Sequence, residues 1–151
     1  MLKNILVGNS NYKNDLFLED RMFRKHVFSV IGSTEIKCEN RTKPIENGDV
    51  IVLHRNSGGV GTSGVIAITT VVGEPSTPKQ LPDGRWMSET PVEPWIVLGE
   101  PISHPEIEAT TGGKLSVQIQ HTVNPIKDVG FTNALVDLIF DHYAKQLRAK
   151  F

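Results

Sequence analysis

Between Ile36 and His54 the sequence sets a compact cluster of charged residues before an uninterrupted apolar run at residues 50–53. The charged residues that open this cluster are Lys37, Glu39, Arg41 and Lys43. A short run of Val, Ile and Leu is typical of a buried strand. The pattern therefore predicts a barrel strand with polar side chains at its rim, an arrangement in which a binding pocket can form.

Length and composition favour a single domain. The chain has 151 residues, of which 38% are hydrophobic and 22% are charged, and this is enough for one core. A single cysteine, Cys38, excludes an internal disulfide, and the apolar stretch after Met1 is too short for a secretion signal or a membrane span. We therefore expect one domain over residues 1–151, located in the cytoplasm and without membrane contact.

The net charge of the chain is −1 at pH 7, so there is no overall attraction for a phosphate backbone. This balance argues against a protein that coats duplexes through many lysines and arginines. Any binding of nucleic acid should therefore be local and should depend on a pocket.

Hydrophobic periodicity predicts a mixture of helices and strands. An amphipathic helix is expected over residues 14–31, ended by Gly32, and a terminal helix is expected from about Phe131 onwards. Strands are expected at residues 35–41, 50–53, 65–72, 95–98 and 115–119. The proline-rich residues 74–94 should form a long loop, and residues 103–107 a short helical turn. Together these elements predict an α+β fold, a small mixed β-barrel flanked by helices, with an amphipathic C-terminal helix.

Three charged residues alternate within the predicted strand at residues 35–41. Lys37, Glu39 and Arg41 would share one face of this strand, because side chains alternate with period two. Such a row can read the polar edge of a base, since the carboxylate accepts from N–H groups while the cations donate to carbonyls or phosphate. The alternative is a solvent-facing ladder of weak ion pairs.

Four polar residues, His54, Arg55, Asn56 and Ser57, follow the next predicted strand. Strand ends at the mouth of a small barrel bring polar groups together on a ligand, although Asn56 and Ser57 can instead cap a turn through their own backbone. Residues 59–64 match the pattern Gly-x-Gly-x-x-Gly, but a strand sequence follows them rather than a helix. They therefore predict a hairpin tip and no dinucleotide site.

Aromatic residues and histidines give weaker signals. Trp86 lies in the predicted loop and can stack on a base, whereas Trp95 begins a predicted strand and is expected in the core. The five histidines show no metal-ligand spacing, and no serine-hydrolase motif is present. No metal or other cofactor is therefore expected.

Residues 37–44 and 48–54 resemble the signature region of ASCH domains, and residues 63–75 resemble the following strand of ASCH and EVE domains. Glu39 and Arg41 match the ASCH pattern Gly-x-Lys-x-x-Glu-x-Arg, while Lys37 stands one residue closer to Glu39 than the pattern has it. The resemblance implies membership of the PUA-like superfamily, whose pseudo-barrels mostly bind RNA or unusual bases.

The favoured hypothesis is a binding module that recognises a nucleobase or nucleotide, in RNA or as a modified base, in the barrel cleft. Glu39 and Arg41 would read the polar edges of the base, Trp86 would cover one face, and Lys43 or Arg55 would contact phosphate. His54, Asn56 and Ser57 would complete the mouth of the cleft.

Two alternatives remain open. Some small ASCH proteins that resemble this segment hydrolyse the acetyl amide of an acetylated cytidine, and here Lys37 and Glu39 would be the catalytic pair, with the required threonine unassigned between Thr34 and Thr42. The other alternative is a protein that binds a free nucleotide signal without turnover.

The terminal helix has apolar residues on more than one face. It therefore either packs deeply into the barrel or buries its second face against another subunit, so we expect a monomer or a weak homodimer.

Overall fold

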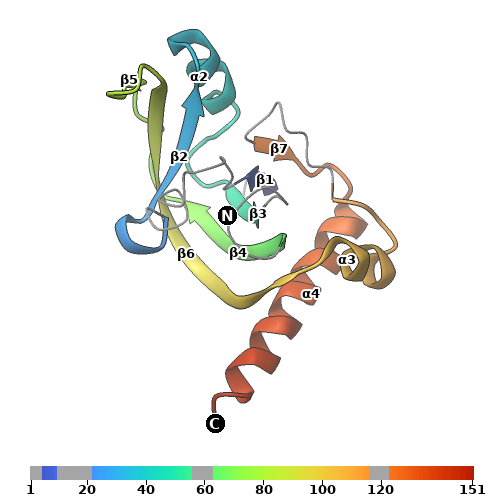
Figure 1. The fold of residues 1–151 in the computed structure, drawn as a ribbon. Helices are drawn as coiled ribbons and strands as arrows, with labels where there is room; N and C mark the ends of the chain where they lie inside the picture. The colour runs from blue at the N-terminus through green and yellow to red at the C-terminus, as the bar shows by residue number, and fades with distance from the viewer. Residues whose placement is uncertain (1–4, 10–21, 56–62, 116–122) are drawn as a thin grey trace.

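The structure is a computed structural model that describes residues 5–9, 22–55, 63–115 and 123–151. The strands are β1 (Ile5–Asn9), β2 (Val27–Gly32), β3 (Val50–Arg55), β4 (Gly64–Val71), β5 (Lys79–Gln80), β6 (Trp86–Ile102) and β7 (Val123–Pro125). The helices are α2 (Glu35–Thr42), α3 (His104–Thr111) and α4 (Val129–Arg148), and residues 22–25 are also helical. The expected α+β class is confirmed, with helices flanking a strongly curled sheet that forms a half-barrel (Figure 1).

The sheet has the strand order β2-β6-β4-β3-β1-β7, and β5 pairs with β6 outside this path. β1 and β3 run parallel, with Asn9 opposite His54, and every other pairing is antiparallel among the residues that the structure describes. The predicted strands at residues 50–53 and 65–72 are confirmed as β3 and β4. The strand predicted at residues 115–119 falls mostly outside the described residues, as does the hairpin tip predicted at residues 59–64.

The long strand β6 curls the sheet, because it changes partner along its length. Its first part, up to Pro91, pairs with β2, and its second part, from Val92, pairs with β4. The prediction of a loop over residues 74–94 is therefore wrong for β5 and for the start of β6. Proline has no N–H to donate, but Pro91 still accepts a hydrogen bond from Val72, and it stands where the strand leaves β2.

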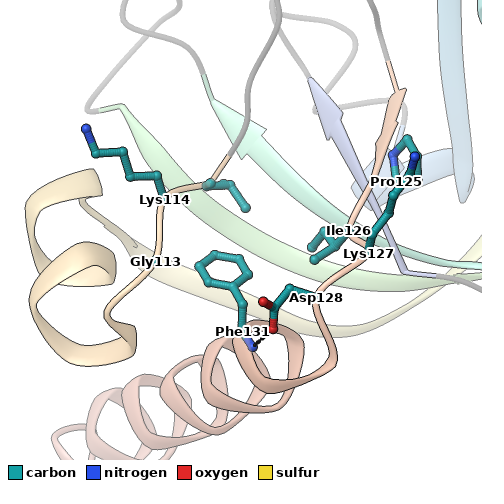
Figure 2. A pocket seen from close by; sticks show the side chains of 8 residues that line it. Gly113, Lys114, Pro125, Ile126, Lys127, Asp128 and Phe131 are labelled. Atoms are coloured by element: carbon teal, nitrogen blue, oxygen red, sulfur yellow. Dashed lines mark hydrogen bonds between the residues drawn. The ribbon is translucent and has the colours of Figure 1, made fainter.

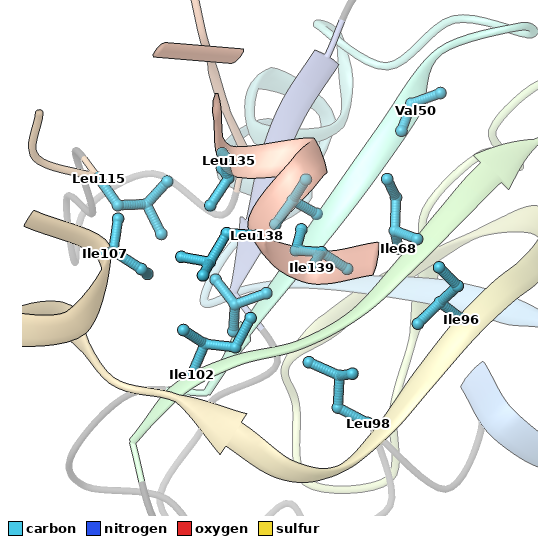
Figure 3. Close-up of a cluster of buried hydrophobic side chains, with 12 residues drawn as sticks. Val50, Ile68, Ile96, Leu98, Ile102, Ile107, Leu115, Leu135, Leu138 and Ile139 are labelled. Carbon is cyan, nitrogen blue, oxygen red and sulfur yellow. The ribbon is translucent and has the colours of Figure 1, made fainter. Parts of the chain in front are cut away.

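Both faces of β3 and β4 are covered by apolar side chains. Val50 and Val52 of β3 belong to one buried cluster with α3 and α4, and the alternate residues Ile51 and Leu53 belong to a second cluster inside the half-barrel. Figure 3 shows α4 over the first cluster, with Leu135, Leu138 and Ile139 directed at the sheet. The predicted terminal helix is thus confirmed, and its first half packs on the sheet.

Two segments differ in type from the prediction. Residues 27–31 were expected to be helical but form β2, and His26, with φ of 55°, separates this strand from the helical residues 22–25. A left-handed residue ends a helix, and the β-branched Val27, Val30 and Ile31 suit a strand better than a helix. The start of the predicted helix, at residues 14–21, lies outside the described residues.

The predicted strand at residues 35–41 is also wrong, because this segment forms helix α2. Thr34 caps the helix, its side chain accepting a hydrogen bond from the Lys37 N–H at 3.1 Å. Cys38 and Thr42, four residues apart, form the buried stripe of the helix, so its burial pattern has the period of a helix. Gly32 lets the helix approach, since a Cβ there would lie 2.4 Å from the Cys38 nitrogen.

The predicted turn at residues 103–107 is confirmed as the beginning of α3. Ser103 is its N-cap and accepts a hydrogen bond from the Glu106 N–H, while Pro105 occupies the first turn, where a missing N–H costs nothing. Asp128 caps α4 in the same way through the Phe131 N–H at 2.8 Å. No helix within the described residues is long and apolar enough to span a bilayer.

Candidate functional site

The three charged residues predicted to form one row lie on helix α2. Residues two apart on a helix point about 200° away from each other, so Lys37, Glu39 and Arg41 do not share one face as a strand would require. Lys37 and Glu39 are exposed, whereas Arg41 is half-buried and donates from Nη1 to the Ile31 carbonyl at 2.9 Å. The geometry proposed for reading a base edge from this segment is therefore wrong, although the residues themselves remain untested as ligands.

Trp86 lies close to α2 through the pairing of the sheet. It is the first residue of β6, opposite Gly32, and it shares a strand face with Ser88, whose hydroxyl is 2.8 Å from that of Thr42. Trp86 is half-buried and not in a loop, and Trp95, predicted in the core, is 48% exposed. The structure thus brings Trp86 towards the α2 group of predicted residues.

The other predicted residues lie where β3 ends. His54 is only 2% exposed, and its Nε2 atom lies 2.7 Å from Nε2 of His104, the first residue of α3. One ring must donate and the other accept, so two neutral rings have to carry opposite tautomers at this contact. The two rings lie 4.8 Å apart between centroids, at 59° to each other.

A β-bulge helps to bring this histidine pair together. The register of β3 against β4 shifts between Leu53 and His54, and bulges turn side chains out of their regular alternation. Arg55, half-buried, follows opposite Gly64, and Asn9 of β1 lies opposite His54. We call this edge, comprising Asn9, His54, Arg55, Gly64 and His104, the strand-end site.

The predicted residues therefore fall into two groups rather than one. Helix α2 packs against β2 and β6, with Trp86 nearby, whereas His54 and Arg55 lie against the first residues of β4 and against α3. Asn56 and Ser57, which follow Arg55, lie outside the described residues. His104 was not a predicted ligand, and the only signal for its position was the Ser-His-Pro start of a helix.

Helix α3 is also tied to α4. The Glu106 carboxylate pairs with Nε2 of His142, which links the first turn of α3 to the middle of α4. Helix α3, which contributes His104 to the strand-end site, is therefore held at two points of its first turn. His54 contacts His104, and His142 pairs with Glu106.

Two hollows lie near α4 and α2 respectively. The first, of about 250 Å³, lies between the start of α4, the connection from β7 and the residues that follow α3 (Figure 2). It is lined by Gly113, Lys114, Leu115, Pro125, Ile126, Lys127, Asp128 and Phe131. The other, of about 560 Å³, lies beside the end of α2 and is lined by residues that include Glu39, Lys43, Glu74 and Ser76. Each combines charged side chains with apolar ones, and neither is lined by His54.

Cys38 does not belong to an exposed site. Its thiol is fully buried and donates to the Val30 carbonyl at 3.4 Å, and burial raises the pKa of the Cys38 thiol above its ordinary value. A buried, protonated thiol is a poor nucleophile. Within the described ranges, no three His, Cys, Asp or Glu residues are grouped as a metal would require.

Comparison with known proteins identifies the fold. No protein-family model matches the sequence, and no curated protein sequence matches it either. Among solved structures, a hypothetical protein from Leishmania major matches with a TM-score of 0.63 at 12% identity, over 91% of this chain and 95% of its own. The human THYN1 protein, in a complex with DNA containing 5-methylcytosine, matches with a TM-score of 0.56 at 14% identity, over 89% of this chain and 96% of its own.

A third match is the Pho92 YTH domain in a complex with m6A, with a TM-score of 0.56 at 14% identity, over 91% of this chain and 83% of its own. These matches show that the chain has the PUA-like fold. The PUA-like fold that the sequence resemblance implied is therefore confirmed. At these identities the similarity concerns the arrangement of helices and strands.

Proposed function

We propose that this PUA-like protein binds a modified nucleobase within a nucleic acid. The observation that carries the proposal is that two structures with this fold, each matched over about nine tenths of this chain, are complexes with a modified base, in one case 5-methylcytosine in DNA and in the other m6A. The sequence analysis also favoured a base-binding module. A modified base is also a suitable ligand for a chain of net charge −1, because recognition then depends on local contacts rather than on the overall charge.

We place the base at the strand-end site. A β-bulge next to a buried histidine that contacts a half-buried one supports this placement, since bulges re-aim side chains near active sites and imidazoles supply both hydrogen-bond donors and acceptors. His104, which is half-buried, would contact a ring nitrogen or an exocyclic group of the base, and the buried His54 would orient its ring through their Nε2 contact. Asn56 and Ser57, which follow Arg55 in the sequence, remain predicted ligands.

Arg55 would contact the phosphate next to the bound base. It follows His54 directly, and its guanidinium can bind a phosphate in a bidentate manner. Contacts of this kind hold the strand in place, while the contacts to the base edge select the base.

Binding of short single-stranded oligonucleotides tests the proposal by fluorescence polarisation. Oligonucleotides that carry one 5-methylcytosine or one N6-methyladenine should bind more tightly than the same sequences without the methyl group. If the protein binds no modified oligonucleotide better than its unmodified counterpart, the proposed function is wrong. A free-nucleotide binder would instead bind mononucleotides equally well and with little dependence on salt.

Point variants locate the site. The change Arg55→Ala should weaken binding to modified and unmodified strands alike and should reduce the slope of log affinity against log salt by about 1. Lys25→Ala, which removes an exposed positive charge elsewhere, is the control and should change neither. Loss of affinity in Arg41→Ala but not in Arg55→Ala would move the site to α2.

The geometry of α2 does not support the amidohydrolase alternative. It needed Lys37 and Glu39 side by side, and on α2 these exposed side chains point in different directions.

A further inference from the structure

The outer face of α4 is apolar where a surface helix is normally polar. All the buried residues of the helix, Leu135, Leu138 and Ile139, lie in its first part, and Figure 1 shows its C-terminal part extending beyond the sheet. Opposite the buried stripe, Phe140 is 49% exposed and Leu147 is 44% exposed. Ala144 lies between them, and the three residues fall within about 60° around the helix axis. We call these three residues the α4 outer face.

The apolar surface continues onto the sheet beside this helix. Val97 of β6 is 47% exposed, and it lines a hollow of about 100 Å³ together with Leu147 and Tyr143. Trp95, which shares a face of β6 with Val97, is exposed as well. An exposed apolar surface that spans two elements is typical of a protein–protein contact rather than of a scattered surface residue.

A row of charges runs along one side of the α4 outer face. It consists of Asp137, Asp141, Lys145 and Arg148, in that order along the helix. The acidic residues come first and the basic residues come last. The row of an antiparallel copy therefore presents basic residues to the acidic ones and acidic residues to the basic ones. Asp141 and Lys145 pair within the helix at 3.0 Å, but both are largely exposed, so exchanging this pair for one between chains costs little.

We propose that the protein forms a homodimer in which two copies of α4 pack antiparallel through the α4 outer face. The two-fold axis of such a dimer is perpendicular to both helices and passes between them. This symmetry puts the charged rows of the two helices on the same side of the dimer, so the row of one copy meets that of the other. Asp137 then faces Arg148 of the other copy, and Asp141 faces Lys145.

Phe140 faces Leu147 of the other copy in the same arrangement. The midpoints of these three pairs all fall between residues 142 and 144, so one axis satisfies both the charges and the apolar contacts. Ala144, close to this axis, lets the two backbones approach, as a small residue at a helix crossing does. The charge order thus selects a second copy of this chain as the partner, rather than an unrelated protein.

Charge reversal on either half of the row tests the dimer. One variant, Asp137→Lys with Asp141→Lys, makes the row wholly basic, and another, Lys145→Glu with Arg148→Glu, makes it wholly acidic. Sedimentation equilibrium from about 5 μM to about 1 mM covers weak and strong association. The unaltered protein should pass from monomer to dimer over this range, each variant alone should stay monomeric, and an equimolar mixture of the two should form a heterodimer.

Two controls separate the contact from a general effect of charge or folding. Glu74→Lys with Glu108→Lys reverses two exposed charges outside α4 and should leave the dimer intact. Circular dichroism should show that all variants keep their helix content. An unaltered protein that is monomeric at the highest concentration overturns the proposal, and so does a mixture of the two variants that fails to associate.

Discussion

Small buried polar groups decide where α2 packs. The Thr42 hydroxyl is 2.8 Å from the hydroxyl of Ser88 and donates to the Cys38 carbonyl at 2.8 Å, while the Cys38 thiol donates to Val30. These groups are buried with their hydrogen bonds made, so they fix the register of the helix on the sheet at little cost. The helix that carries the charged residues of this segment is therefore held on the sheet by the uncharged Cys38 and Thr42.

Ionisation of Cys38 should destabilise the fold at high pH. Burial raises the pKa of the Cys38 thiol above its ordinary value, so at high pH the folded protein retains a proton that the unfolded chain loses. The stabilising contribution is complete below the pKa of the unfolded chain and is lost as the pH rises through that of the folded state. Urea unfolding between pH 7 and pH 11 should therefore show a decline in stability above about pH 9.

The variant Cys38→Ser is the comparison, because a hydroxyl can still donate to Val30 and does not titrate in this range. Its stability should decline less than that of the unaltered protein over the same interval. Parallel declines in the two proteins would show that Cys38 is not the responsible group.

At the scale of elements, the sequence predicted those segments whose burial pattern is simple. The continuous runs of β3 and β4 are buried on both faces, and α4 repeats its apolar residues at helical spacing. The prediction failed for residues 35–41 because alternating charges suggested a strand, whereas Thr34 and the spacing of Cys38 and Thr42 specify a helix.

β6 shows the second kind of failure. Its prolines argue against a strand when only neighbouring residues are considered, yet pairing with β2 and β4, both distant in the sequence, makes it the longest strand of the described sheet. Pairing of this kind depends on contacts that no local window contains.

Removal of the N-cap tests the helix assignment of residues 35–42. Thr34→Ala should lower the free energy of unfolding by about 1 kcal/mol, since the Lys37 N–H loses its acceptor. Thr34→Ser keeps the oxygen and should change stability much less. Equal stability of all three proteins in urea would mean that this cap contributes nothing to the fold.

At the scale of the molecule, the fold class was predictable and the assembly of the site was not. The sequence indicated a small barrel with flanking helices, but it gave no sign that the α2 residues and the strand-end residues lie on different parts of the sheet. His104 joins His54 across fifty positions of the chain, a contact that follows from the fold and not from any local motif.

The two buried clusters should unfold together. They share the strands β3 and β4, so loss of either exposes a face of the same sheet. Ile139→Ala in one cluster and Ile51→Ala in the other should each destabilise by about 2–5 kcal/mol. Thermal unfolding followed by circular dichroism and by tryptophan fluorescence should give one coincident transition in each protein. Separate transitions would divide the chain into independently stable units.

The covering of β3 and β4 on both sides limits where another molecule can touch this protein. Every described side chain of these two strands is buried or half-buried, so a partner meets the central sheet only at its margins, where the strands stop and the connecting segments begin. Substitutions at those margins and on the exposed faces of the helices can therefore change ligand binding while the interior stays the same. Recognition can thus evolve separately from stability.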